Sequence, residues 1–160
     1  MKNKNVGIGW SKLITWIVGV EVIGIAGSVF TAGSISSWYQ FLNKPAFNPP
    51  NWLFGPVWTI LYAMIGTVGY MLWQQKSNEM RTIKKLFVTQ LVLNAIWSPI
   101  FFGAQRTDWA LVIILALWTV IVGLMVKLWK QWRSLVWWIA PYLMWVSFAS
   151  LLNFSVWLLN

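Results

Sequence analysis

The chain has no cysteine and no histidine, and only three of its 160 residues are acidic. The lack of cysteine excludes disulfides, thiolate nucleophiles and thiolate metal sites. Because histidine is lacking as well, neither histidine nor cysteine can ligate a haem, and a zinc site and an imidazole base are also excluded. The acidic residues Glu21, Glu79 and Asp108 lie in three separate segments, so a hydrolase with paired carboxylates is not indicated. We expect no cofactor and no metal site.

What the chain does have is apolar side chain and tryptophan. Hydrophobic residues make up 59% of the sequence and charged residues 9%, against about 45–50% and about 25% in soluble domains. There are 15 tryptophans, a residue that favours membrane–water interfaces and also lines pockets for large flat ligands. The composition therefore predicts a protein whose solvent is lipid.

Five apolar segments are each long enough to cross a bilayer as a helix, which takes about 20 residues. They are residues 13–32, 52–73, 85–104, 109–129 and 135–159. Short connections at 74–84, 105–108 and 130–134 carry most of the remaining charge. The alternating pattern of a membrane barrel is absent. We predict an all-α membrane protein, with residues 1–160 forming one bundle of five transmembrane helices.

The net charge of +9 is distributed between the apolar segments. Five spans would place ten basic residues on the side of the N-terminus: Lys2, Lys4, Lys12, Lys76, Arg81, Lys84, Lys85, Lys127, Lys130 and Arg133. The other side would hold only Lys44 and Arg106. This bias predicts a cytoplasmic N-terminus, an outward first loop and location in the cytoplasmic membrane. It indicates topology signals and lipid contacts rather than a nucleic-acid partner.

The first loop, residues 33–51, is rich in aromatic residues and proline. Proline fixes φ and reduces the entropy that ordering costs, and long loops between helices often cap a site. We therefore expect a lid over a site, which includes Pro49, Pro50 and Trp52. The alternative is an interfacial segment that rests on the bilayer.

Polar residues within the spans repeat at helical spacing and so share faces. In the third span these are Gln90, Asn94, Trp97, Ser98 and Phe101; in the fifth, Tyr142, Trp145, Ala149 and Asn153; in the second, Trp58 and Tyr62. The stripes either join helices through hydrogen bonds or line a pocket. For Trp58, Asn94, Trp97 and Trp145 we favour the pocket, and for Gln90 and Asn153 both interpretations stay open. Glu21, within the first span, has three possible roles: proton coupling, binding of a cationic ligand, or a hydrogen bond to another helix.

Together these residues resemble the TspO/translocator protein family, also called peripheral benzodiazepine receptors. The resemblance runs from Trp38 to Trp157. It is strongest in three blocks: Trp38-Tyr39, Leu42, Lys44-Pro45, Pro49-Pro50, Trp52, Gly55-Pro56-Val57-Trp58 and Leu61-Tyr62; then Leu93-Asn94, Trp97, Pro99-Ile100-Phe101-Phe102-Gly103-Ala104 and Trp109-Ala110-Leu111; and Pro141-Tyr142-Leu143, Trp145, Phe148-Ala149 and Leu152-Asn153.

The resemblance implies a five-helix bundle, a homodimer, and a pocket under the first loop. That pocket would bind porphyrins and ligands of the benzodiazepine and isoquinoline-carboxamide kinds. The implied pocket residues are Tyr39, Trp58, Asn94, Trp97, Ser98, Trp145 and Ala149, and we add Tyr62 from its stripe. Animal members carry a cholesterol-recognition pattern after the fifth span. Residues 153–160 contain neither tyrosine nor a basic residue, so we do not expect cholesterol to bind.

The leading hypothesis is a membrane receptor or sensor for tetrapyrroles, with the ring stacked by Trp58, Trp97 and Trp145 and oriented by Asn94 and Tyr39. A second hypothesis is light- and oxygen-dependent porphyrin degradation, for which the resemblance implicates Trp58 and Trp145. A third is a small-molecule transporter coupled to protons through Glu21. An indole is neither a general acid nor a general base, and no inverted repeat is visible, so we rank both alternatives lower.

Overall fold

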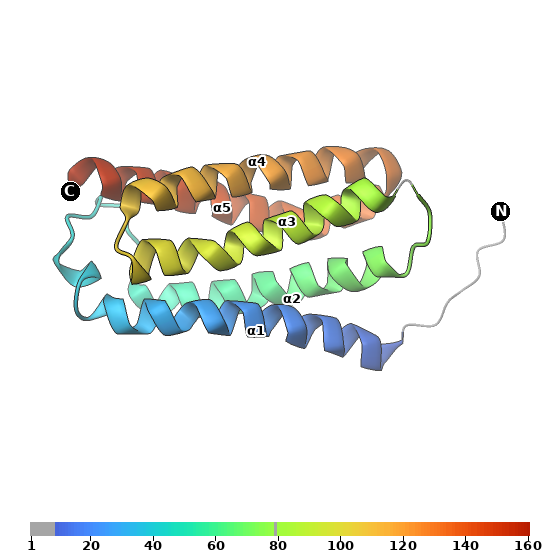
Figure 1. The fold of residues 1–160 in the computed structure, drawn as a ribbon, viewed down its shortest axis with the longest axis horizontal. Coiled ribbons are helices and arrows are strands. Elements are labelled where there is room, and N and C mark those ends of the chain that lie inside the picture. The colour runs from blue at the N-terminus through green and yellow to red at the C-terminus, as the bar shows by residue number, and fades with distance from the viewer. Residues whose placement is uncertain (1–8, 79) are drawn as a thin grey trace.

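The structure is a computed structural model that describes residues 9–78 and 80–160, and in it five long helices form a bundle (Figure 1). The helices are α1 (Trp10–Ile35), α2 (Phe54–Trp73), α3 (Met80–Ser98), α4 (Thr107–Gln131) and α5 (Arg133–Leu159). Three short helical segments, η1 (Tyr39–Phe41), η2 (Asn51–Leu53) and η3 (Pro99–Gly103), lie between them. No strand occurs in the described part of the chain, and the predicted all-α class is confirmed. Lys2, Lys4 and Glu79 lie outside the described residues.

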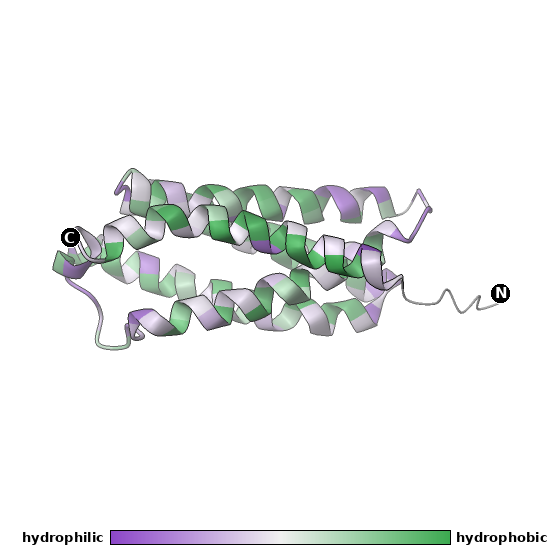
Figure 2. Ribbon diagram, turned by 90° about the horizontal axis from the view of Figure 1, so that it is seen from below, coloured by the Kyte–Doolittle hydropathy of each residue, from purple (hydrophilic) through white to green (hydrophobic). Residues whose placement is uncertain are grey.

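All five long helices are long and apolar enough to cross a membrane, so the chain is a multi-pass membrane protein. Hydrophobic residues run along the middle of the bundle, and hydrophilic residues gather toward its ends (Figure 2). Large apolar side chains face outward, among them Val29, 70% exposed, and Met144, 73% exposed. Lipid is the medium in which such exposure is favourable.

The helices extend beyond most of the apolar segments from which they were predicted. Residues 80–84 were expected in a charged turn, but they form the first turns of α3. The expected turn at 130–134 is reduced to Trp132, because α4 continues to Gln131 and α5 begins at Arg133. Lysine and arginine are good helix formers, and their long side chains reach water from the ends of a span. The apolar segments of the sequence therefore predict which parts of the chain cross the membrane, but they do not predict where each helix begins and ends.

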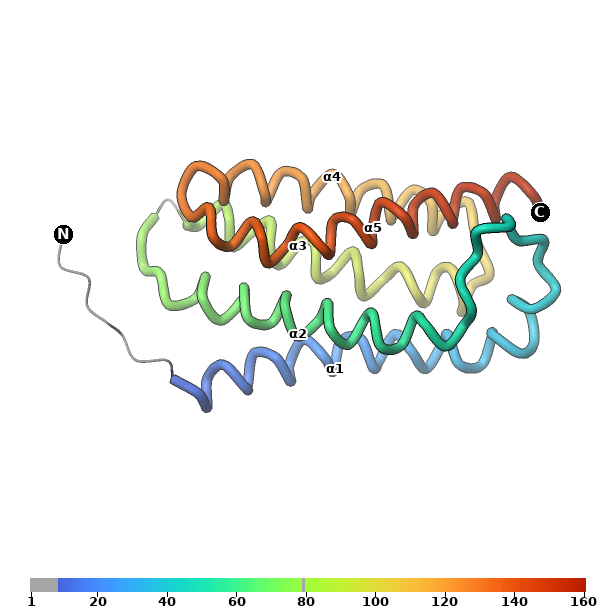
Figure 3. Tube along the Cα trace, turned by 180° about the vertical axis from the view of Figure 1, so that it is seen from behind, coloured from blue at the N-terminus to red at the C-terminus, as the bar shows by residue number. Residues whose placement is uncertain are grey.

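The two halves of the bundle are packed differently. In the half that contains the α2–α3 and α4–α5 connections, the core is tight, with Val68, Ile83 and Leu135 completely buried. Glycines allow α1 to approach α2 closely there: a Cβ on Gly66 would lie 2.7 Å from the Cα atom of Ile17. The opposite half, called the loop end below, contains the α1–α2 loop, the α3–α4 turn and the C-terminus (Figure 3).

The α1–α2 loop is folded against the loop end rather than extended into solvent. Part of the expected loop 33–51 is helical, since α1 continues to Ile35 and η1 follows. The Asn43 backbone N–H donates to Asn160 Oδ1 at 2.9 Å, and Asn160 Nδ2 donates to the Asn43 carbonyl at 3.0 Å. Tyr39 is 4% exposed and packs beside Phe101 and Phe102. These contacts hold the loop over the ends of the helices.

Candidate functional site

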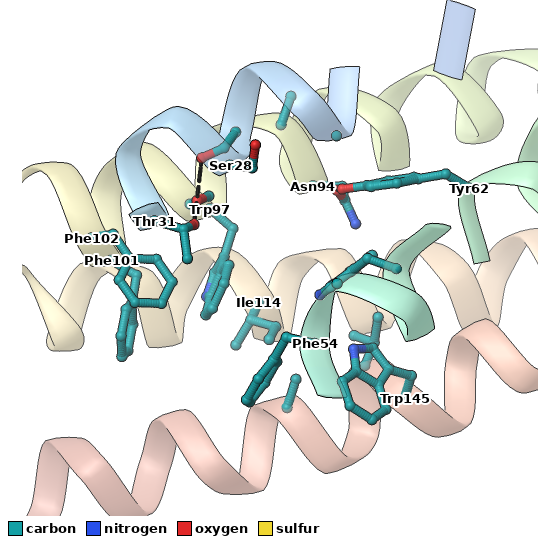
Figure 4. A pocket seen from close by; sticks show the side chains of 18 of the residues that line it. Ser28, Thr31, Phe54, Tyr62, Asn94, Trp97, Phe101, Phe102, Ile114 and Trp145 are labelled. Carbon is teal, nitrogen blue, oxygen red and sulfur yellow. Dashed lines mark hydrogen bonds between the residues drawn. The ribbon is translucent and has the colours of Figure 1, made fainter. Parts of the chain in front are cut away.

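A cavity of about 460 Å³ occupies the loop-end half of the bundle. All five long helices and the α1–α2 loop contribute to its wall, and most of the lining is apolar or aromatic (Figure 4). This volume falls within the range of about 300–1,000 Å³ that is usual for small-molecule sites. A second, smaller pocket of about 170 Å³ is lined by α1 and Leu91 of α3, and it is below the range usual for a small-molecule site.

The eight residues predicted for ligand binding all line this cavity: Tyr39, Trp58, Tyr62, Asn94, Trp97, Ser98, Trp145 and Ala149. The sequence stripes on α2, α3 and α5 thus converge on one space. Their role in binding stays a prediction. Of the residues with two open interpretations, Asn153 also lines the cavity, whereas Gln90 is not part of the described lining and bonds another helix instead.

Three tryptophans of the lining are each held against other aromatic rings. Trp58 stacks on Tyr62 with ring centroids 5.1 Å apart, and Trp97 stacks on Phe101 at 5.1 Å. Trp145 meets Phe54 edge-on at 5.8 Å. Such pairs restrict the rotamers of the rings. The cavity therefore has aromatic walls that are positioned before any ligand enters.

A chain of hydrogen bonds begins at the cavity wall and continues into the core. The Tyr62 hydroxyl donates to Asn94 Oδ1 at 2.7 Å, and Asn94 Nδ2 donates to the Tyr142 hydroxyl at 3.0 Å. The Tyr142 hydroxyl in turn donates to Gln90 Oε1 at 2.9 Å. Asn94 was expected to orient a ligand, and the structure shows that its amide also joins α2, α3 and α5. In this network the stripe has both roles that were considered, pocket lining and helix-to-helix bonding.

Four further polar contacts hold the wall nearer the loop. Trp97 Nε1 donates to Asn153 Oδ1 at 3.1 Å, while Asn153 Nδ2 donates to the Thr107 carbonyl at 2.9 Å. The Ser98 hydroxyl donates to the Gly27 carbonyl at 2.9 Å and lies 2.9 Å from the Thr31 hydroxyl. These bonds fix α3 against α1, α4 and α5 around the cavity.

The indole nitrogen of Trp145 is different from the other polar atoms of the wall. Among the described residues, Trp145 Nε1 is the buried side-chain nitrogen or oxygen that has no hydrogen-bond partner. Figure 4 shows the Trp145 ring on α5, near Phe54 at the start of α2. A buried donor without a partner is costly, by about 1–3 kcal/mol. The wall of the cavity thus holds a donor that has no partner in the described protein, and a ligand's acceptor atom would bond it only after the Trp145 ring turns, because the nitrogen itself is buried.

The cavity also opens to the side, between the loop-end halves of α1 and α2. Several lining residues of these two segments are exposed: Ile25, Ser28, Ala32, Gly55 and Thr59. Farther along, the two helices touch, because Gly24 fits directly against the Tyr62 ring. This exposed part of the lining lies between two helices that are each long and apolar enough to cross a membrane.

The loop contributes the roof of the cavity through Tyr39. Its hydroxyl donates to Asn48 Oδ1 at 2.9 Å, and burial raises the pKa of Tyr39, so this hydroxyl stays protonated at neutral pH. The predicted lid residues Pro49, Pro50 and Trp52 are not among the described lining residues, although Asn51 is. Trp52 is 71% exposed. The lid role of these three residues stays a prediction.

Sequence reasoning named Glu21 of α1 and Phe101 of η3 but missed the other lining residues of these two elements. Thr31 on α1 and Phe102 in η3 line the cavity beside Phe54 of α2 (Figure 4). On α1 the available signal was the spacing of the small residues Gly24, Gly27 and Ser28, which lets other helices approach closely. In η3, Pro99 breaks the α-helical pattern and a π-helical turn follows, which no periodic pattern would place.

The sequence matches known proteins over most of its length. Residues 16–158 match the TspO/MBR family. The tryptophan-rich protein TspO of Archaeoglobus fulgidus is 45% identical, over 93% of this chain and 97% of the relative. The protein CrtK of Rhodobacter capsulatus is 34% identical over 91% and 90%, and the translocator protein of Bos taurus is 34% identical over 92% and 89%.

Proposed function

Because the chain belongs to the TspO/MBR family, we propose that it is a membrane receptor or sensor that binds a tetrapyrrole in the loop-end cavity. The same cavity would accept aromatic ligands of the benzodiazepine and isoquinoline-carboxamide kinds. The observation that carries the proposal is the Trp145 indole, a buried donor without a partner in an aromatic wall. A flat ring would stack on the aromatic wall, and an acceptor atom on that ring would bond the indole N–H.

The arrangement of the three tryptophans supports a flat ligand. Trp58, Trp97 and Trp145 come from α2, α3 and α5, and all line the same cavity. Each is braced by another ring, so little side-chain entropy is lost when a ligand stacks against it. The remaining wall is mostly apolar, as is usual for sites that take large aromatic molecules.

The membrane orientation is part of the proposal. We propose that the protein lies in the cytoplasmic membrane with the loop end outside. Lys12, Lys76, Lys84 and Lys130 lie at the end of the bundle opposite the loop end, while Lys44 and Arg106 lie at the loop end. This distribution agrees with the positive-inside rule. A ligand would then enter from the outer side or from the outer leaflet.

The Trp145 donor can be tested with Trp145→Phe, which keeps an aromatic ring but removes the N–H. We expect the affinity for protoporphyrin, titrated into protein in detergent and followed by its absorption band, to fall about tenfold. The matched control is Trp118→Phe, because the Trp118 N–H donates to the exposed Ser147 hydroxyl and does not line the cavity. Equal affinities of the two variants would contradict the role of the Trp145 donor.

A second candidate function, light-dependent degradation of a bound porphyrin, is favoured by the position of Trp58 and Trp145. Both rings line the cavity, so an electron donor would lie next to an excited ligand. We expect product only under illumination with oxygen, and at a lower rate in Trp58→Phe. If free tryptophan in solution gives the same rate as the protein, this second function is contradicted.

A further inference from the structure

Glu21 is the charged residue among the described side chains that line the cavity, and neither function above uses it. It lies on α1 on the same face as Gly24, Ser28 and Thr31, as their helical spacing requires. An ionisable residue within a membrane span is costly, and such residues usually face a cavity or a partner of opposite charge. Glu21 therefore calls for a chemical explanation.

Among the described residues, no basic side chain pairs with this carboxyl group. In residues 9–78 and 80–160, the ion pair that forms joins Arg106 to Asp108 at the loop end, and no lysine or arginine reaches Glu21. Tyr62 packs against Gly24, one turn from Glu21, but its hydroxyl donates to Asn94 and not to the Glu21 carboxyl group. The carboxyl group at the inner end of the cavity is available to a ligand.

A lysine lies near the loop end of the cavity, outside its lining. Lys44 Nζ lies 4.9 Å from the centre of the Tyr39 ring, which forms the roof, and it donates to the Leu42 carbonyl at 3.0 Å. The cavity thus has a carboxyl group at its inner end and an ammonium group above its roof. Charge placed in this way selects ligands by their own charge and sets their direction.

We propose that Glu21 makes the cavity a site for flat aromatic ligands that carry a protonated amine, with the amine at the inner end. The ammonium group would donate charge-assisted hydrogen bonds to the Glu21 carboxylate, which are stronger than bonds between neutral groups. This inference rests on the proposed function, namely that flat aromatic molecules bind in the cavity.

Two probes with the same ring separate the charge from the stacking. One is the dimethyl ester of protoporphyrin, which is neutral, and the other is its bis(aminoethyl)amide, which is cationic. We expect wild type to bind the amine probe more tightly than the ester, and Glu21→Gln to weaken the amine probe about tenfold, the range for a hydrogen bond to a charged group. The ester should bind both proteins equally, which also shows that the variant is folded.

Controls assign the effect to this carboxyl group. Asp108→Asn removes the same charge outside the cavity, and we expect it to keep the preference for the amine; Glu21→Asp should keep part of it. Equal amine binding by wild type and Glu21→Gln would overturn the inference, and so would an equal loss for both probes, which would make Glu21 structural. If neither probe binds wild type, the proposed function fails as well.

Discussion

At the scale of single residues, the site depends on side chains that serve packing and binding at once. Tyr62 stacks on Trp58, donates to Asn94 and lines the cavity. Its ring has space only because residue 24 is glycine: a Cβ there would lie 2.0 Å from Tyr62 Cε2. A methyl group at this position therefore acts on the site through Tyr62.

Gly24→Ala should displace the Tyr62 ring, lower the melting temperature in detergent and weaken protoporphyrin binding. Overpacking of this kind costs about 1–3 kcal/mol. Gly19→Ala on the same helix is the matched control, because its Cβ would meet nothing within 4 Å. The control should melt at or above the wild-type temperature, since alanine favours a helix. Identical melting of the two variants would show that the contact does not matter.

The chain of hydrogen bonds from Tyr62 to Gln90 gives a second test at this scale. Tyr142→Phe leaves Asn94 Nδ2 and Gln90 Oε1 without their shared partner, and Tyr142 is 1% exposed. We expect a loss of about 1–2 kcal/mol in the free energy of unfolding. Tyr70→Phe is the control, since the Tyr70 hydroxyl accepts from the Gly9 N–H at the end of the bundle, where water can replace it. A loss that is no larger in Tyr142→Phe than in Tyr70→Phe would contradict the role of the network.

The polar stripes could be predicted from sequence at residue scale, but their bonding could not. Spacing places Asn94 and Tyr142 on inward faces, because polar groups in a membrane avoid lipid. Spacing does not tell which helix lies opposite. The hydrogen bond between Asn94 and Tyr142, which are 48 residues apart, could therefore not be predicted from the sequence. For the same reason, the hydrogen bond from the Ser98 hydroxyl to the Gly27 carbonyl could not be predicted.

At the scale of elements, the close contact of α1 with α2 holds one wall of the cavity in place. Gly66→Ala would bring a Cβ to 2.7 Å from the Cα atom of Ile17, and backbone atoms cannot turn aside as a side chain can. We expect α1 to separate from α2, with a larger fall in melting temperature than for Gly24→Ala. Gly123→Ala on α4 meets nothing within 4 Å and should be neutral. An unchanged melting temperature in Gly66→Ala would argue against this contact.

The five helices were predictable because a bilayer demands long apolar segments whose backbone bonds are internal. Their ends were not, since Arg81 and Lys84 are polar and yet helical. The predicted span over residues 85–104 did not anticipate the π-helical segment that begins at Pro99. This segment places Phe101 against Trp97, so the missed detail belongs to the site.

At the scale of the whole molecule, the absence of cysteine makes the orientation simple to measure. Ser37→Cys lies at the loop end and Ser77→Cys at the opposite end, and both positions are exposed. We expect a membrane-impermeant maleimide to label Ser37→Cys in intact cells and Ser77→Cys only after permeabilisation. The reverse pattern would overturn the proposed orientation, since wild type has no thiol to confuse the result.

The outer surface of the bundle is apolar on every helix, so it suits either lipid or another copy of the chain. The resemblance implies a homodimer, and this stays a prediction, because apolar side chains cover the outside on all helices. Composition predicts that such a surface faces an apolar medium but does not separate lipid from a partner. The cavity, in contrast, is complete within one chain, since all five of its helices contribute to the wall.

The most direct test of the account is the affinity for protoporphyrin of the double variant Trp58→Ala with Trp145→Ala. Both rings line the cavity, whereas the control pair Trp109→Ala with Trp137→Ala removes two tryptophans that are 57% and 68% exposed. Stacking on an aromatic residue contributes about 1–3 kcal/mol for a flat base, so losing both rings should weaken binding at least about tenfold. The control pair should bind as wild type does. Unchanged affinity in the cavity pair, or an equal loss in both pairs, would contradict binding in this cavity.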